Sequence, residues 1–129
     1  MTVKMLLVED RPQVWGLVLD LLSTVGDFTL AKAVSTEAEA NLWLEENPGQ
    51  WDLAVVDLVL EQGTGLGVLA RARQHARGAK IVVFSEYITQ GMRKHCLELG
   101  ADEAFQKSTD TKAFVDYCAG VAASRRRDR

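Results

Sequence analysis

The sequence is poor in the residues that build zinc sites and disulfide frameworks. It has only two cysteines, Cys96 and Cys118, and two histidines, with no CxxC motif and no cysteine–histidine cluster at ligand spacing. A zinc site and a disulfide scaffold are therefore not expected. Both cysteines lie on apolar stripes of predicted helices, which favours reduced thiols in the core of a cytosolic protein.

The sequence also lacks the features of membrane-bound and nucleic-acid-binding proteins. No apolar run approaches the roughly 18 residues of a membrane span, and no basic and then apolar leader is present. The net charge is −3, from 15 lysines and arginines against 18 acidic residues, whereas proteins that bind nucleic acid generally rely on a basic surface. We therefore expect a cytoplasmic protein with no direct contact to nucleic acid or membrane.

Length and composition indicate one domain. The chain has 129 residues, within the roughly 100–200 residues of a typical domain. Hydrophobic residues make up 47% of it, enough for a core that needs no metal or disulfide. We expect residues 1–129 to form a single domain in which residues 124–129, rich in arginine, are a basic and frayed tail.

Five short apolar runs alternate with amphipathic stretches along the chain. They are predicted strands and span residues 3–8, 28–34, 53–56, 81–84 and 104–105. Three of them are nearly continuous in aliphatic residues, as expected for strands of a parallel sheet that is covered on both faces.

The amphipathic stretches have the 3.6-residue period of helices. Pro12 suits the first turn of the first helix, Ser35 is the expected cap of the second, and Ser108 or Thr109 that of the last. The apolar stripe of the first helix is Val14, Leu17, Val18, Leu21, Leu22 and Val25.

This alternation predicts an α/β fold, a doubly wound parallel sheet with helices on both faces. Ligands of such sheets bind outside the carboxyl ends of the strands. Polar side chains follow four of the predicted strands at this edge: Glu9, Asp10, Asp57, Ser85 and Lys107.

The residue types at this edge of the sheet indicate phosphoryl chemistry. Neighbouring carboxylates repel one another unless a cation lies among them, and ligands that offer only oxygen favour Mg²⁺, with Mn²⁺ or Ca²⁺ as alternatives. A carboxylate held between a divalent ion and a lysine ammonium, with a hydroxyl nearby, is equipped to accept a phosphoryl group.

Five segments together resemble the receiver domain of bacterial response regulators, and the resemblance covers the whole chain. They are LLVEDR (residues 6–11), VVDL (55–58), VVFS (82–85), LELGAD (97–102) and FQKS (105–108). The resemblance implies a flavodoxin-like fold with five strands in the order 2-1-3-4-5. It also implies two-component signalling, in which a histidine kinase or a histidine phosphotransfer protein donates a phosphoryl group.

The resemblance implies a metal site around the phosphoacceptor. Asp57 is implied to accept the phosphoryl group and to bind Mg²⁺ together with Asp10. Glu9 would assist through a water molecule, and the backbone carbonyl of Val59 would be a further ligand.

The resemblance also implies how the signal is produced. Ser85 would be the switch hydroxyl, and Lys107 would contact the phosphoryl group. Such a module is not an enzyme, because it assists only its own phosphorylation and dephosphorylation. The cognate kinase, the output partner, an effector domain outside these residues and the oligomeric state are left open.

Four positions depart from the usual pattern of the family. Glu61 and Ser108 stand where prolines are common, so a cis peptide after the lysine is not expected. Ala104 replaces an aromatic residue that moves with the switch hydroxyl, so we expect any signal to travel through the backbone and the fourth helix. Glu86 replaces a small residue, and we favour an outward-facing carboxylate, since one facing the site would repel a phosphoryl donor.

Two more side chains are expected to modulate the lifetime of the phosphorylated state. The ring of Tyr87 is placed to cover an acyl phosphate, and Val59 offers no polar group to orient a hydrolytic water. Both features favour slow decay.

Three other functions fit these residues less well. A degenerate receiver, which folds and binds proteins without being phosphorylated, is favoured only by Glu86 and Ala104. An FMN-binding flavodoxin is disfavoured, because Glu9 and Asp10 would repel the FMN phosphate. A phosphoaspartyl hydrolase of the haloacid-dehalogenase kind is disfavoured, because Val59 stands where its second aspartate would be.

Overall fold

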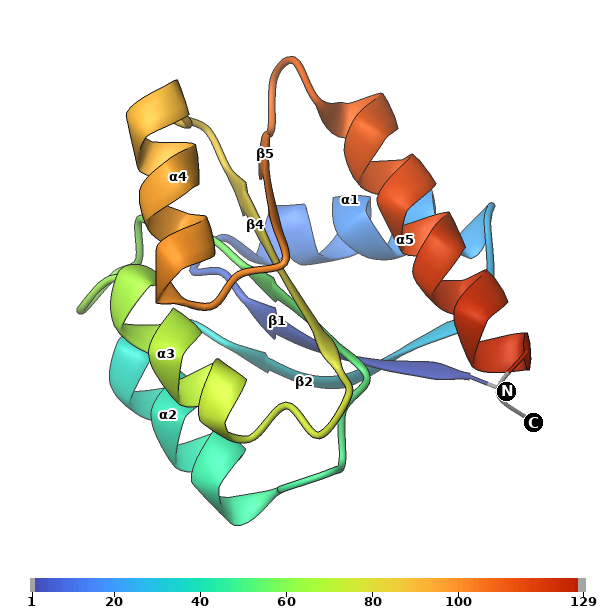
Figure 1. Cartoon of the computed structure of the whole chain (residues 1–129), viewed down its shortest axis with the longest axis horizontal. Coiled ribbons are helices and arrows are strands. Elements are labelled where there is room, and N and C mark those ends of the chain that lie inside the picture. Colours follow the sequence, from blue (N-terminus) through green and yellow to red (C-terminus); the bar gives the residue numbers. More distant parts are fainter. Residues whose placement is uncertain (1, 128–129) are drawn as a thin grey trace.

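The computed structural model describes residues 2–127 of the chain. Strands and helices alternate from one end to the other (Figure 1). The strands are β1 (Val3–Val8), β2 (Phe28–Val34), β3 (Leu53–Val56), β4 (Lys80–Ser85) and β5 (Glu103–Gln106). The helices are α1 (Pro12–Ser23), α2 (Glu37–Glu46), α3 (Leu66–Gln74), α4 (Gln90–Leu99) and α5 (Thr111–Arg127).

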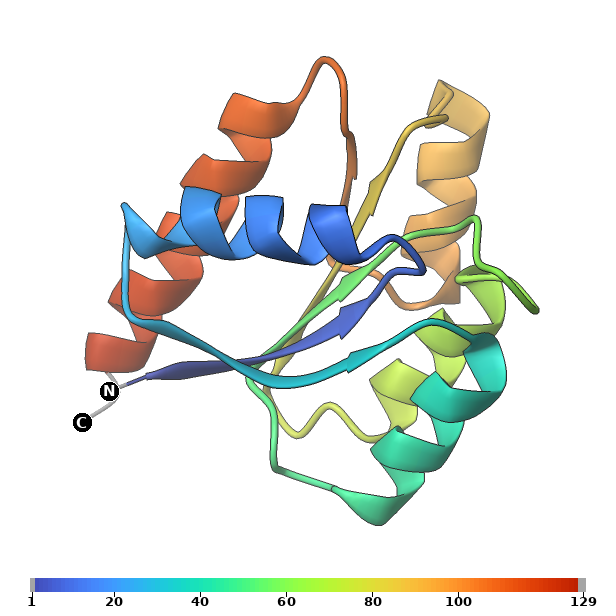
Figure 2. The ribbon, with the colours of Figure 1, turned by 180° about the vertical axis from the view of Figure 1, so that it is seen from behind.

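The strands form one parallel sheet in the order β2-β1-β3-β4-β5, which confirms the predicted fold (Figure 2). The first three strands have the predicted bounds, and β4 and β5 each extend one residue further at both ends. The chain order reverses between β1 and β3, so a crevice opens at the carboxyl ends of these two strands.

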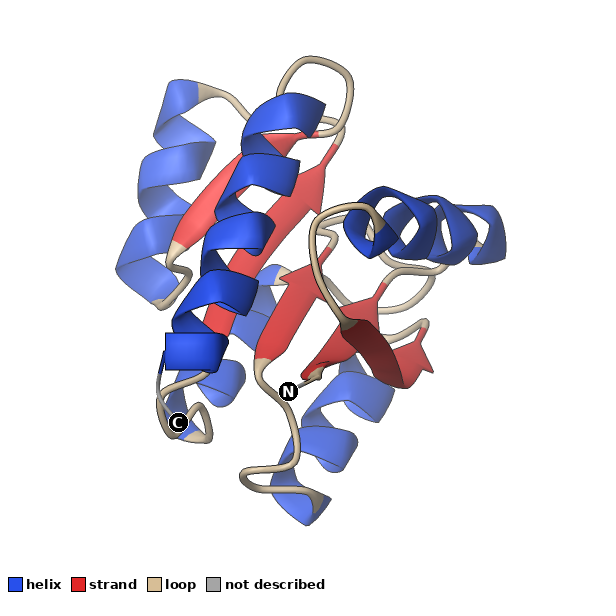
Figure 3. Ribbon diagram, turned by 90° about the vertical axis from the view of Figure 1, so that its right-hand side faces the viewer, coloured by secondary structure: helices blue, strands red, loops and turns tan. Residues whose placement is uncertain are grey.

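Helices cover both faces of the sheet, as the sequence predicts (Figure 3). Alternate residues of a strand point to opposite faces. Met5 and Leu7 pack with α1 and α5, whereas Leu6 and Val8 pack with α2 and α3. All four side chains are buried, which is why β1 is a continuous apolar run rather than an alternating one.

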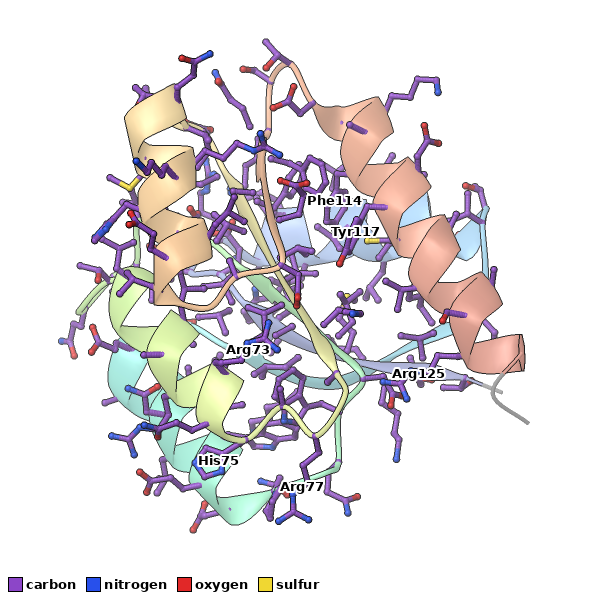
Figure 4. The ribbon with its side chains drawn as sticks, in the orientation of Figure 1. Arg73, His75, Arg77, Phe114, Tyr117 and Arg125 are labelled. Carbon is purple, nitrogen blue, oxygen red and sulfur yellow. The ribbon has the colours of Figure 1, made fainter. Side chains whose placement is uncertain are left out.

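Helix α5 packs on the sheet through aromatic side chains. The rings of Phe114 and Phe84 are stacked with centroids 4.1 Å apart, and Phe105 meets Phe114 edge-on at 6.0 Å. Phe114 and Tyr117 project from α5 toward the sheet (Figure 4). Cys118 is buried in the same layer and Cys96 in the opposite one, and both are free thiols, as expected.

Two expectations about the first two helices are wrong in detail. Leu17, placed on the buried stripe of α1, is 53% exposed, because α1 contacts the sheet through Val14, Val18 and Leu22 while Leu17 borders a groove toward α5. The cap of α2 is Thr36 and not Ser35. The Thr36 hydroxyl accepts the Glu39 amide at 3.2 Å and donates to the Glu39 carboxylate at 3.0 Å, a reciprocal pair that Ser35 is one residue too early to make.

The last helix also differs from the prediction at both ends. It begins at Thr111, because residues 107–110 form a turn in which the Asp110 carboxylate accepts the Gln106 amide at 2.9 Å, so neither Ser108 nor Thr109 caps it. Within the expected frayed tail, residues 124–127 are helical, and Arg125 lies 3.4 Å from Asp52. Residues 128 and 129 lie outside the described part.

Residues 2–127 contain neither a cis peptide bond nor a helix that could span a membrane. The peptide bonds there include no cis bond, in line with the replacement of proline by Ser108. No helix in that part of the chain is both long enough and apolar enough to cross a membrane.

Candidate functional site

Three of the polar residues predicted from the strand ends line one pocket, and Glu9 and Lys107 lie next to Asp57 beside it. The pocket has a volume of about 220 Å³ and is lined by Asp10, Arg11, Asp57, Val59, Ser85, Glu86 and Tyr87. Backbone hydrogen bonds between neighbouring strands position the residues around it. The Glu9 amide donates to the Val34 carbonyl at 2.9 Å and the Asp57 amide to the Val8 carbonyl at 2.9 Å, so pairing continues past the ends of β1 and β3.

Three carboxylates meet in this crevice. Glu9, Asp10 and Asp57 each offer one oxygen, and these oxygens lie within 4.8 Å of one another. Glu9 and Asp57 are buried, with 2% and 5% of their surface exposed, whereas Asp10 is partly exposed. Buried acidic side chains at such spacing repel one another, so the fold holds them together only with compensating positive charge.

The Asp57 carboxylate accepts hydrogen bonds from three groups. Ser85 Oγ donates to Oδ1 at 2.6 Å, the Val59 amide donates to the same oxygen at 3.3 Å, and Lys107 Nζ donates to Oδ2 at 3.0 Å. Burial alone would raise the pKa of Asp57, but the hydrogen bond from Ser85 and the charge of Lys107 lower it below the ordinary 3.8. Asp57 is therefore ionised at neutral pH.

Lys107 joins the acidic cluster to the end of β4. Its Nζ lies 2.5 Å from Glu9 Oε1 as well as near Asp57, and its backbone amide donates to the Ser85 carbonyl at 2.9 Å. Burial raises the pKa of Glu9 above 4.5, and the nearby Asp57 charge adds to this, although Lys107 opposes it. The Glu9 backbone carbonyl in turn accepts the Trp15 indole N–H at 2.8 Å.

An ion pair that the sequence reasoning missed lies on the rim of the pocket. Arg11 Nη1 is 3.3 Å from Glu86 Oε1, and Arg11 Nε is 3.6 Å from Glu9 Oε2. The Glu86 side chain is 49% exposed, so its carboxylate points neither fully outward nor into the acidic cluster but toward Arg11. A basic residue directly after an acidic pair was the only available signal.

The other expected modulators occupy two different places. Tyr87 is 76% exposed and Val59 62% exposed, so both border the pocket and neither covers it. Ala104 is buried on the α4 side of the sheet, beside a hollow of about 280 Å³ that Ile88, Arg93 and Phe105 also line. The small side chain leaves open the space beside β5.

The donor set fits a hard divalent cation. Glu9, Asp10, Asp57 and Glu86 contribute four negative charges to the crevice and its rim, while Arg11 and Lys107 supply two positive ones. The ligand atoms on offer are all oxygens, which Mg²⁺ prefers. A divalent cation would balance the excess charge.

Comparison with known proteins identifies the family. The sequence model of the response regulator receiver domain matches residues 5–119. The chain therefore belongs to the response regulator receiver family, the signalling domain of two-component systems. No curated protein sequence is significantly similar to it.

Solved structures agree on the fold. A two-component response regulator of the LuxR family from Aurantimonas sp. SI85-9A1 superposes with a TM-score of 0.81 at 23% identity, covering 96% of this chain and 87% of that one. CheY from Borrelia burgdorferi, solved with CheX, BeF3 and Mg²⁺, gives 0.81 at 17% identity, with 92% and 88% covered. A CheY-like receiver domain from Methanospirillum hungatei JF-1 gives 0.79 at 18% identity, with 100% of both chains covered.

Proposed function

We propose that this domain accepts one phosphoryl group on Asp57 and changes its surface as a result. The donor is a histidine kinase or a histidine phosphotransfer protein, the phosphoryl source of the receiver family. Membership of the family supports a phosphoacceptor role. A cytoplasmic location and an output partner that recognises the phosphorylated surface are parts of the same proposal.

The proposal depends on one observation: the contacts of the Asp57 carboxylate. This side chain is buried, ionised and hydrogen-bonded to both Ser85 and Lys107 at the mouth of a crevice with two further acids. In transfer, an Asp57 oxygen forms a bond to phosphorus. The bond from phosphorus to the donor breaks, and its electron pair leaves with the donor.

Each neighbour of Asp57 has a task in this step. Lys107 offsets the negative charge of the carboxylate and the incoming phosphoryl group, which otherwise repel each other. The Ser85 hydroxyl, now bound to Asp57, is placed to donate to a phosphoryl oxygen once Asp57 is modified. That exchange of hydrogen bonds moves β4 and the loop after it, which is the change the domain transmits.

Asp10, Asp57 and the backbone carbonyl of Val59 would hold Mg²⁺, with Glu9 acting through a water molecule. When bound, the ion supplies positive charge to the transferring phosphoryl group. Glu9 and Asp57 are buried, so their carboxylates would stay at this position rather than turn to solvent.

A degenerate receiver is the second candidate, favoured by Glu86 and by Ala104 in place of an aromatic residue. The two functions differ in one measurement. The protein is incubated with Mg²⁺ and phosphoramidate, and its intact mass is measured before borohydride reduction locates any acyl phosphate.

We expect wild type to gain one phosphoryl group and Asp57→Asn to gain none. Asp116→Asn is the matched control, because Asp116 is exposed on α5, pairs with Lys112 and does not line the pocket. It should be modified like wild type. Absence of modification in wild type, with phosphoramidate and with acetyl phosphate alike, would favour the degenerate receiver instead.

A further inference from the structure

The loop after β3 runs from residue 58 to residue 65 and carries Val59. Two contacts tie Val59 to its surroundings: its amide donates to Asp57 Oδ1 at 3.3 Å, and it forms an antiparallel bridge with Thr64. The Gly65 amide closes the loop on the Leu58 carbonyl at 3.0 Å. The position of Val59 relative to Asp57 therefore depends on where Thr64 is held.

Thr64 is held by a side chain from a different part of the fold. Glu37, in the first turn of α2, accepts the Thr64 amide on Oε1 at 2.9 Å. The Glu37 amide donates to the Gln62 carbonyl at 3.1 Å, and Thr36 forms a parallel bridge with Gln62. The start of α2 thus binds the loop at two positions, Gln62 and Thr64.

Two glycines lie against Glu37, Gly63 in the loop and Gly67 in the first turn of α3. A side chain at Gly63 would bring a Cβ atom to 2.5 Å from Glu37 Cβ, and one at Gly67 would overlap the Glu37 carboxylate. Gly63 also has a φ of +77°, where residues with side chains are strained. Gly63 therefore needs glycine, whereas a side chain at Gly67 would displace the Glu37 carboxylate from Thr64.

We propose that Glu37 is a positioning residue for the phosphorylation site. It fixes Thr64, and Thr64 fixes Val59 through their bridge. The Val59 amide binds Asp57, and its carbonyl is the expected Mg²⁺ ligand. The inference rests on the proposed function, since it concerns the metal site of Asp57. It adds a residue 20 positions before Asp57 that touches no reacting atom.

The carboxylate of Glu37 suits this task for two reasons. A charged acceptor makes a stronger hydrogen bond to a backbone amide than a neutral one, and negative charge is stabilised in the first turn of a helix. Glutamine would keep the acceptor oxygen and lose the charge, alanine would lose both, and aspartate would keep the charge with a shorter reach.

These differences define the test. Mg²⁺ affinity of the full chain is measured by calorimetric titration for wild type, Glu37→Ala, Glu37→Asp and Glu37→Gln, and hydrogen exchange is followed for the amides of residues 58–65. We expect Glu37→Ala and Glu37→Asp to weaken Mg²⁺ binding about five-fold, the ratio that one hydrogen bond is worth. The Thr64 amide should exchange faster in both, and Glu37→Gln should restore most of the affinity.

Glu39→Ala is the matched control. Glu39 lies on the same turn of α2 and pairs with the Thr36 hydroxyl, without contacting the loop. Its removal should lower the melting temperature and leave Mg²⁺ affinity unchanged. If Glu37→Ala does not fold, Glu37→Asp carries the test, because aspartate is favourable in a first helical turn.

The outcomes separate this inference from the proposed function. Wild type that neither binds Mg²⁺ nor takes up a phosphoryl group contradicts the proposed function itself. Wild type that does both, with Glu37→Ala and Glu37→Asp titrating as wild type does, overturns the role of Glu37 alone. Equal weakening in Glu39→Ala would also overturn it, since the effect would then belong to helix stability.

Discussion

Removal of the Glu86 carboxylate should speed phosphorylation by small anionic donors. Glu86 lies on the rim of the pocket that contains Asp57, and the phosphoryl group must pass this rim. Its negative charge opposes the approach of an anion. Arg11, 3.3 Å away, offsets part of that charge, so Glu86→Ala both removes the repulsion and frees a cation.

The exposure of Glu86 and its pairing with Arg11 limit the size of the effect. Two like charges about 8 Å apart repel by about 2 kcal/mol at an effective dielectric of 20 and by about 0.5 kcal/mol in water. Because half of the Glu86 side chain is exposed and Arg11 compensates it, the lower end applies. We expect a rate increase of about two- to five-fold. Arg11→Ala should slow the reaction, and the double variant should lie close to wild type.

The assay is the initial rate of phosphorylation by acetyl phosphate and by phosphoramidate, at saturating Mg²⁺ so that altered metal affinity does not contribute. The ratio of variant to wild type should be larger for acetyl phosphate, which carries more negative charge. It should shrink as salt increases, because the Debye length falls from about 30 Å at 0.01 M to about 10 Å at 0.1 M. Equal rates for Glu86→Ala and wild type at low salt would refute the electrostatic reasoning.

Three further predictions concern metal binding, pH and backbone strain. Asp10→Ala should lose Mg²⁺ binding and keep the fold, as calorimetric titration and circular dichroism would show; undiminished binding contradicts the assigned ligand. Because burial raises the pKa of Glu9, stability linked to this group is fully present below pH 4.5 and is lost as the pH rises through the raised value. Without Mg²⁺, Glu9→Gln should therefore be more stable than wild type toward urea at pH 7 but not at pH 4. Equal stability of the two proteins at pH 7 would argue against a raised Glu9 pKa. Arg77 has a φ of 45° in the turn between α3 and β4 (Figure 4), so Arg77→Gly should raise the unfolding free energy by about 0.5–1 kcal/mol while Arg77→Ala does not.

The fold and the acidic side chains of the site could be predicted because each depends on features that are local in the sequence. An apolar run determines a buried strand, and the residue that follows it lies at the carboxyl edge of the sheet. Glu9, Asp10, Asp57, Ser85 and Lys107 were found by this rule, and the structure places all five in one crevice.

Contacts that depend on packing between elements could not be predicted in the same way. Arg11 and Glu86 are 75 positions apart and meet only because two loops face each other across the crevice. The exposure of Leu17 follows from how α1 is rotated against α5, which helical period alone does not determine. The hydrogen bond from the Thr64 amide to Glu37 joins α2 to the loop after β3, and neither residue belongs to a recognisable sequence motif.

Asp52 links the two end elements of the described chain, because its carboxylate accepts the Lys4 amide of β1 at 2.8 Å and lies 3.4 Å from Arg125 of α5. These contacts stand at the edge of the sheet opposite the acidic crevice. The chain ends could therefore be moved to another place in the fold without changing the geometry of the site. A circular permutant, closed by a short linker and opened at the turn of residues 47–50, keeps every strand end that borders the crevice.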